Sequence, residues 1–155
     1  MSFRVYIGHS VAPHELGAIY GMAELAARKG MEPIIPDRRW QPAAAPARVV
    51  QLLNNLHAFV AVATLSGQHL PWVNTELAQG LKLGLNGQNA VSVIDAGLAP
   101  PSTGQVVVID RTNFDRTISE AVRILERLQL EQTQRNLLAG LVLGGLIALL
   151  LASKE

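Results

Sequence analysis

The chain has 155 residues, of which 49% are hydrophobic and 16% are charged, and its formal net charge is +1. This length predicts one domain, and a net charge near zero gives no electrostatic reason to expect a nucleic-acid partner. The absence of cysteine excludes disulfides, thiolate catalysis and zinc–thiolate sites, and it is compatible with a cytosolic protein. The N-terminal run MSFRVYIGHS lacks a charged region followed by a long apolar stretch, so we expect no secretory signal.

Strand-like and helix-like segments alternate along about the first 130 residues. Apolar runs rich in β-branched residues predict strands at 3–8, 32–36, 57–64, 90–95 and 105–110. Apolar residues at helical spacing predict helices at 14–29, 48–56, 71–83 and from 114 onward. This alternation predicts an α/β fold, with a five-stranded parallel sheet and helices on both faces.

The loops that follow the first three strands contain the candidate site residues. Ligands of such sheets bind beyond the carboxyl ends of the strands. The sequence has no metal-ligand spacing such as HExxH and no Gly-rich phosphate loop, and its serines lack the strained elbow of a hydrolase nucleophile. The polar and aromatic candidates in these loops are His9, Ser10, Arg38, Arg39, Trp40, Ser66 and Trp72.

A further candidate, Glu76, follows Trp72 by four residues in the run LPWVNTELAQG. A carboxylate in the first turns of a helix is favoured by the helix macrodipole whatever its function. Trp72 is equally compatible with packing beneath the helix, and Arg38 and Arg39 with ordinary solvated loop charges. The residue types alone therefore leave both a functional and a purely structural interpretation open.

Three stretches together resemble the Toll/interleukin-1 receptor (TIR) domain, especially its bacterial forms. They are VYIGHS, PIIPDRRW and AFVAVATLSGQHLPWVNTEL, and they belong to the first three strands and the loops after them. Trp72, Val73 and Glu76 match the Trp-Val-x-x-Glu motif of the family at its spacing. The resemblance covers about residues 3–130 and implies a flavodoxin-like TIR fold for a domain at 1–130. The ligand loops depart from the family pattern at three points. The first loop lacks the usual acidic residue soon after its serine unless Glu15 serves, and the loop PDRRWQPAAAP lacks the common Pro-Gly at its tip. Pro71 stands where a small polar residue is more usual.

The resemblance implies an activity: enzymatic members of the family cleave the nicotinamide–ribose bond of NAD⁺, and the glutamate that matches Glu76 carries the reaction. Nicotinamide leaves as a neutral ring while the ribose develops positive charge, which a neighbouring carboxylate can stabilise. NAD⁺ would then be a substrate, and no metal or other cofactor is expected. Related nucleoside deoxyribosyltransferases, which use a glutamate at a similar place, are a neighbouring interpretation. The residues expected to line the substrate pocket are His9, Ser10, Arg38, Arg39, Trp40, Ser66 and Trp72.

The end of the chain, residues 137–155, forms a hydrophobic tail after a polar connector at 131–136, and it has no charge between Arg135 and Lys154. As a helix, residues 136–153 would span about 27 Å, against roughly 30 Å for a bilayer core. We therefore expect residues 137–153 to form a transmembrane helix that anchors a cytoplasmic domain to the inner membrane. A buried hairpin helix and an oligomer seam are the alternatives. Gly140 and Gly144 have the spacing at which membrane helices associate closely.

Two functional hypotheses follow from these features. The first is a tail-anchored TIR NAD⁺ nucleosidase in antiphage defence or signalling, activated by assembly into a homo-oligomer or filament. The second is a non-catalytic TIR scaffold, or a receptor for a nucleotide signal, whose clustering acts through the membrane tail. Glu76 favours the first hypothesis, whereas the tail and the departures in the ligand loops favour the second.

Overall fold

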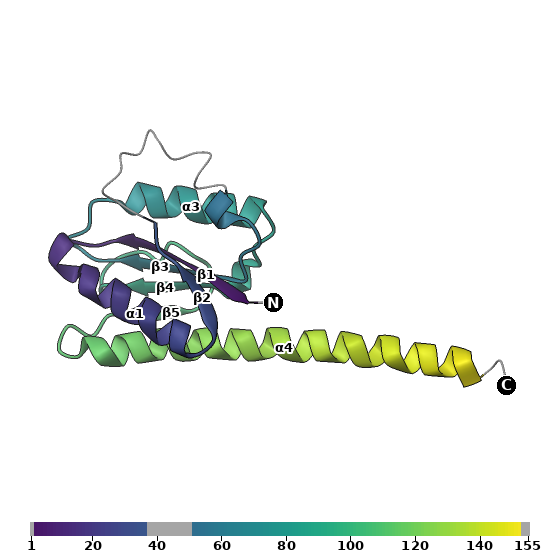
Figure 1. Cartoon of the computed structure of the whole chain (residues 1–155). Coiled ribbons are helices and arrows are strands. Elements are labelled where there is room, and N and C mark those ends of the chain that lie inside the picture. Colours follow the sequence, from purple (N-terminus) through teal and green to yellow (C-terminus); the bar gives the residue numbers. More distant parts are fainter. Residues whose placement is uncertain (1, 37–50, 153–155) are drawn as a thin grey trace.

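A computed structural model describes residues 2–36 and 51–152, with side chains up to residue 140. All five strands are parallel and form one sheet in the order β2-β1-β3-β4-β5 (Figure 1). This order is the one found in flavodoxin-like doubly wound sheets. The predicted five-stranded parallel sheet is therefore confirmed. The strands are β1 (Phe3–Ser10), β2 (Met31–Ile34), β3 (Ala58–Ala63), β4 (Ala90–Ile94) and β5 (Val106–Val108).

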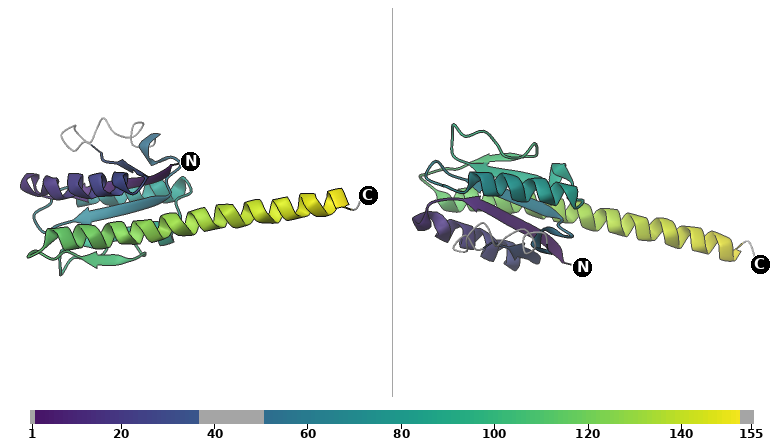
Figure 2. Two further views of the ribbon diagram at one scale, coloured as in Figure 1. Left: turned by 60° about the horizontal axis from the view of Figure 1, so that its bottom comes forward. Right: turned by 90° about the horizontal axis from the view of Figure 1, so that it is seen from above.

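Helices cover both faces of the sheet, as predicted. Helices α1 (Leu16–Arg28) and α4 (Phe114–Ala152) lie side by side on one face, and α3 (Leu70–Lys82) lies on the other (Figures 1 and 2). Two short 3-10 helices, η1 (Pro13–Glu15) and η3 (Gly87–Asn89), precede α1 and β4. The sheet is thus the middle layer of three.

The side chains of the strands divide into two cores because successive residues of a strand point to opposite faces. On β1, Val5 and Ile7 pack toward α1 and α4, whereas Tyr6 packs toward α3. The α3-side core is the smaller one. Its buried members are Tyr6, Leu53, Leu56, Phe59, Ala61, Val73, Leu77, Leu85 and Ala90.

Some element boundaries differ from the predicted ones. Strand β5 covers only Val106–Val108 of the predicted range 105–110, and β2 ends at Ile34 rather than at residue 36. The helix predicted at 48–56 is helical at residues 51–53 and then turns. Asn55 has a φ of 58°, a left-handed conformation that ends a helix. The start of this predicted helix, residues 48–50, lies outside the described residues.

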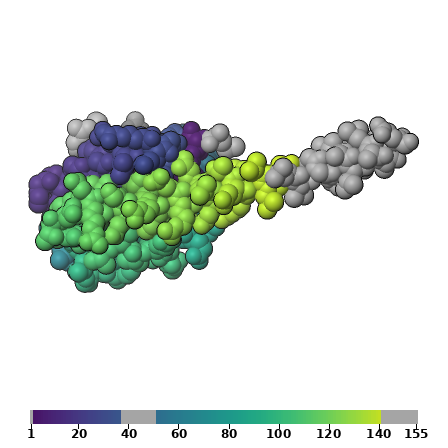
Figure 3. Space-filling model, turned by 90° about the horizontal axis from the view of Figure 1, so that it is seen from below, coloured from purple at the N-terminus to yellow at the C-terminus, as the bar shows by residue number. Residues whose placement is uncertain are grey.

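Helix α4 runs without a break from Phe114 to Ala152, so the expected connector at 131–136 is helical. Beyond Leu128, the last of its described side chains that is buried in the core, α4 extends away from the rest of the domain (Figures 1 and 3). In that extension, Leu137 is 64% exposed. Among residues 2–36 and 51–140, whose side chains the structure describes, no helix combines the length and the apolar character that a membrane crossing requires. The expected transmembrane helix is therefore not supported there, and all but the first four residues of its range, 137–153, lie outside those described side chains.

Candidate functional site

The first feature of the site is the loop at residues 64–69, which lies against the end of β1. In a sheet of this order, the ligand crevice lies outside the carboxyl ends of β1 and β3, where the chain connections diverge. The carbonyl oxygen of Ser10, the last residue of β1, accepts a hydrogen bond of 3.0 Å from the Thr64 amide. Its hydroxyl oxygen accepts another, of 2.9 Å, from the His69 amide. Both ends of the loop are therefore tied to Ser10.

Between these ties, Gly67 packs directly against the backbone of Ser10. A Cβ atom built on Gly67 would lie only 1.9 Å from the Ser10 carbonyl oxygen. No other residue type fits there without displacing the loop. The crevice at β1 and β3 is therefore covered by a closely fitted turn.

Glu76 lies on α3 and is fully buried against β1. The hydroxyl of Tyr6 donates a hydrogen bond to its Oε2 atom. A Cβ atom on Gly8 would lie 2.9 Å from the Phe59 ring and 3.3 Å from Glu76 Oε1, so the glycine leaves space for both the ring and the carboxylate. A buried carboxylate is tolerated only where hydrogen bonds replace its hydration. Strand β1 supplies both the space and a donor.

The three residues of the Trp-Val-x-x-Glu motif have different environments on α3. Pro71 stands in the first turn, as predicted, and Trp72 beside it is half-buried. Val73 is fully buried in the α3-side core. Trp72 precedes Glu76 by one helical turn, so it lies nearer to the carboxyl edge of the sheet. In the motif, Val73 therefore packs in the core, and the buried carboxylate of Glu76 lies one helical turn below the partly exposed indole of Trp72.

The remaining predicted site residues are distributed over several places. Ser10 is buried on the same face of β1 as Tyr6 and holds the loop at 64–69. His9 is buried on the opposite face, since it pairs with Val62 of the α1-side core. Ser66 is exposed in the loop. The structure thus brings Ser10 and Trp72 toward Glu76 and does not bring His9 there. Arg38, Arg39 and Trp40 lie outside the described residues.

A second polar cluster, which the sequence reasoning did not single out, surrounds Arg111 at the same edge of the sheet. The Nε atom of Arg111 donates to Asp95 Oδ1 at 2.8 Å, and one terminal nitrogen donates to Asp95 Oδ2. The other terminal nitrogen donates to Glu15 Oε2 at 2.6 Å. The side chains of Asp95 and Glu15 are 6% and 5% exposed, whereas that of Arg111 is 44% exposed. One half-exposed guanidinium therefore neutralises two buried carboxylates.

The two carboxylates also hold the loop at 64–69. Glu15 Oε1 accepts a hydrogen bond of 2.7 Å from the Thr64 hydroxyl, and Asp95 Oδ2 accepts one of 2.8 Å from the Leu65 amide. Arg111 thus connects the segments that follow β1, β4 and β5 to the loop that follows β3. The cluster was detectable from the sequence, because Asp95 comes directly after β4 and Arg111 comes three residues after β5, and both strands are rich in β-branched residues. Both residues follow the fourth and fifth strands, outside the three loops that contain the predicted site residues.

The ionisation of this cluster follows from its contacts. Burial alone would raise the pKa of Glu15, but donors from Ala12, Thr64 and Arg111 outweigh it and hold that pKa below the ordinary value. The hydrogen bonds from Arg111 are the main reason that the pKa of Asp95 is also lowered. The same bonds raise the pKa of Arg111. All three groups are charged at neutral pH.

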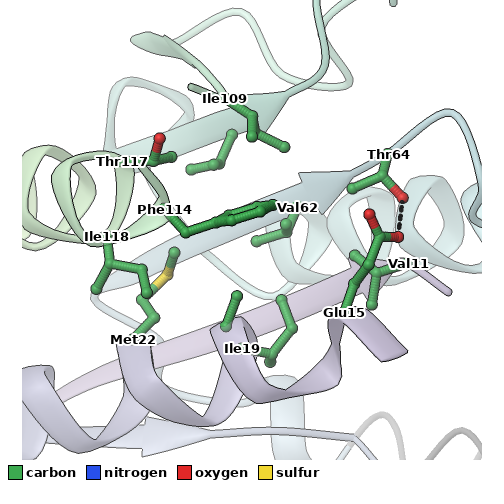
Figure 4. Close-up of a pocket in the computed structure, with 12 residues that line it drawn as sticks. Val11, Glu15, Ile19, Met22, Val62, Thr64, Ile109, Phe114, Thr117 and Ile118 are labelled. Carbon is green, nitrogen blue, oxygen red and sulfur yellow. Dashed lines mark hydrogen bonds between the residues drawn. The ribbon is translucent and has the colours of Figure 1, made fainter. Parts of the chain in front are cut away.

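A small cavity lies next to this cluster, between α1, α4 and the sheet (Figure 4). It measures about 20 Å³, roughly the room that one water molecule needs. The ring of Phe114 and the aliphatic part of the Glu15 side chain both border it (Figure 4). The cavity lies on the α1 side of the sheet and is too small for a nucleotide, so it is separate from the Glu76 site.

Within the part of the chain that the structure describes, no group of three or more histidine or carboxylate residues is arranged to hold a metal ion. A comparison with models of known protein families and a comparison with curated proteins each found no match to this chain.

Proposed function

We propose that the chain is a TIR-type NAD⁺ nucleosidase in which Glu76 stabilises the positive charge that develops on the ribose. The observation that carries this proposal is the fully buried Glu76 carboxylate, for which Gly8 leaves space and to which Tyr6 donates. An apolar side chain in its place would avoid the desolvation cost that a buried carboxylate carries. Keeping a carboxylate there at a cost in stability is typical of a functional site.

In the proposed reaction, the bond between C1′ of the ribose and N1 of nicotinamide breaks. Both electrons of that bond go to the nicotinamide, which leaves as a neutral ring. The carboxylate of Glu76, oriented by the Tyr6 hydroxyl, faces the electron-poor ribose and lowers the barrier electrostatically. Water then adds to C1′ and loses a proton, which gives ADP-ribose; an internal nucleophile of the adenosine half would give a cyclic product instead.

The test of this proposal is the release of nicotinamide from NAD⁺ by purified protein, measured both dilute and under conditions that drive assembly. Glu76→Gln is the decisive variant, because Gln has almost the same shape and can still accept a hydrogen bond from Tyr6. We expect release from the wild type and a loss of at least about a hundredfold in the variant, on the scale of a lost electrostatic stabiliser. Release that persists in Glu76→Gln would exclude the role given to Glu76. No release from the wild type in any assembly state would exclude the enzyme.

A second candidate function is a non-catalytic scaffold or nucleotide-signal receptor, in which clustering is the output. The observation in its favour is the extension of α4, where Leu130, Leu137 and Leu138 are all more than half exposed. Apolar side chains in such a row are typical of a contact surface. This scaffold would assemble as a homo-oligomer or filament, without turning over NAD⁺.

The proposed place of action for either candidate is the cytoplasmic face of the inner membrane, in antiphage defence or signalling. Its support is the composition of residues 137–153, which contain no charged residue. A protein that lacks residues 137–155 tests this location. If the shortened protein still sediments with membranes, the location assigned to the tail is wrong. If it loses cellular toxicity while a wild-type tail with Glu76→Gln keeps it, the scaffold is the better description.

A further inference from the structure

We propose that the loop at residues 64–69 is a gate over Glu76, and that Arg111 is the positioning residue that latches this gate through Asp95 and Glu15. The consequence for catalysis rests on the proposed function, because Glu76 must meet a substrate. The gate itself is a property of the fold and can be measured without NAD⁺.

Glu76 lies below the carboxyl edge of the sheet. Its carboxylate lies beside Gly8, and Gly8 lies on the same face of β1 as Ser10, two residues before the strand ends. Two strand residues correspond to about 6.6 Å. A ligand that approaches from the carboxyl edge therefore has to pass Ser10 before it reaches Glu76.

The loop at residues 64–69 covers Ser10. Gly67 lies against its carbonyl group so closely that no Cβ atom fits, and the His69 amide donates to its hydroxyl at 2.9 Å. The loop therefore fills the position through which the approach from the edge would run. Helix α3, which carries Glu76, begins at Leu70 immediately after it. Moving the loop away from Ser10 uncovers the path along β1.

Asp95 and Glu15 hold the loop from its other side. The Leu65 amide and the Thr64 hydroxyl donate to Asp95 and Glu15, respectively. Both of these carboxylates are fixed by the single guanidinium of Arg111, whose bonds to them are described above. Loss of that cation leaves both carboxylates without a charged partner among the bonds described for them, although the Ala12 amide still donates to Glu15 Oε1 at 2.8 Å. Arg111 therefore controls the loop without touching Glu76.

The experiment compares Arg111→Gln with a matched control, Arg116→Gln. Arg116 is an exposed arginine that pairs with Glu120 at 3.5 Å on the surface of α4, so its loss leaves the loop contacts intact. Amide hydrogen exchange of Leu65 and His69 is followed together with the labelling of the Glu76 carboxyl by a carbodiimide and an amine. Both readouts report opening of the gate, and neither depends on catalysis.

We expect Arg111→Gln to speed exchange at Leu65 and His69 and to raise labelling of Glu76, each by roughly three- to tenfold. Exchange in the strand β3 should stay unchanged, and Arg116→Gln should match the wild type. Arg111→Lys keeps the positive charge but cannot donate two hydrogen bonds to Asp95 with a planar group. Its amide protection should therefore lie between that of Arg111→Gln and that of the wild type. A folded Arg111→Gln with unchanged exchange and labelling overturns the proposal.

The wild type supplies a second measurement if Arg111→Gln does not fold. A gate requires the Leu65 and His69 amides to open more often than the amides of β3. If they exchange only when the whole domain unfolds, the gate does not exist. The outcome is also separable from the proposed function: faster labelling of Glu76 in a protein that never cleaves NAD⁺ keeps the gate and removes the nucleosidase.

Discussion

The hydroxyl of Tyr6 on β1 donates a hydrogen bond to the carboxylate of Glu76 on α3, and both side chains are fully buried. This bond joins residues that are 70 positions apart in the chain. It ties the buried Glu76 side chain on α3 to a residue of the sheet. The stacked rings of Tyr6 and Phe59, whose centroids lie 5.2 Å apart, fix the direction of the hydroxyl.

The first prediction concerns this bond. Tyr6→Phe removes the donor and leaves the aromatic ring, so we expect a loss of about 1–3 kcal/mol in the free energy of unfolding. Urea denaturation measures the change. Tyr20→Phe is the matched control, because Tyr20 is 60% exposed, and it should leave stability within about 0.5 kcal/mol of the wild type.

The double variant Tyr6→Phe with Glu76→Leu gives the second prediction. It removes the donor and the carboxylate together, so no polar group of the pair is left unsatisfied. We expect the double variant to lose less stability than the sum of the losses of Tyr6→Phe and Glu76→Leu alone, while any NAD⁺ cleavage is lost. If the double variant is less stable than Tyr6→Phe alone, Glu76 contributes to folding, and its burial would no longer be an argument for function.

The third prediction concerns the closely packed turn. Gly67→Ala places a methyl group 1.9 Å from the Ser10 carbonyl oxygen. Because both groups belong to or are attached directly to the backbone, the clash can be relieved only by a shift of the loop or of β1. We expect a loss of about 1–3 kcal/mol, measured by thermal or urea unfolding. Gly17→Ala is the control, since nothing lies within 4 Å of its new methyl group. Because Gly17 is an exposed position within α1, replacing it by alanine should stabilise the protein by up to about 1 kcal/mol. Equal effects of the two changes would contradict the close packing at Ser10.

The fourth prediction concerns acid. The pKa values of Glu15 and Asp95 are both lowered in the folded protein. Their contribution to stability is therefore complete above the ordinary values, 4.5 for Glu15 and 3.8 for Asp95, and is lost as the pH falls through the lower folded values. The melting temperature should drop steeply in this acidic range. Arg111→Gln should be less stable at neutral pH and should show a shallower acid dependence, whereas Arg116→Gln should follow the wild-type curve.

The fold was predictable because its signals are local and repeated. Buried parallel strands such as AFVAVA are apolar on both faces, and they alternate with helical patterns that leave few topologies open. Boundaries were less predictable, since they depend on single backbone conformations. Asn55, for example, ends a helix through a left-handed φ that no apolar pattern encodes.

The candidate site was predictable only in part. Glu76 was found through its spacing from Trp72, but its partner Tyr6 looked like an ordinary strand residue, because a contact across 70 positions has no local pattern. The two-residue period of the strand determines which of the neighbours Ser10 and His9 faces α3. Adjacent residues of a strand face opposite sides, so at most one of these two can face Glu76.

The last prediction concerns the extension of α4. The core contacts of this helix end at Leu128, and Leu137 and Leu138 are 64% and 63% exposed. A protein that ends at Gly140, with both leucines changed to Gln, should therefore unfold at the same temperature as the intact domain. Its self-association should fall, because apolar area removed from water drives such contacts. Sedimentation velocity over a concentration series measures the association. A matched protein that ends at Gly140 but keeps both leucines separates their effect from that of residues 141–155. If association is the same in all three proteins, the assembly contact lies elsewhere on the domain.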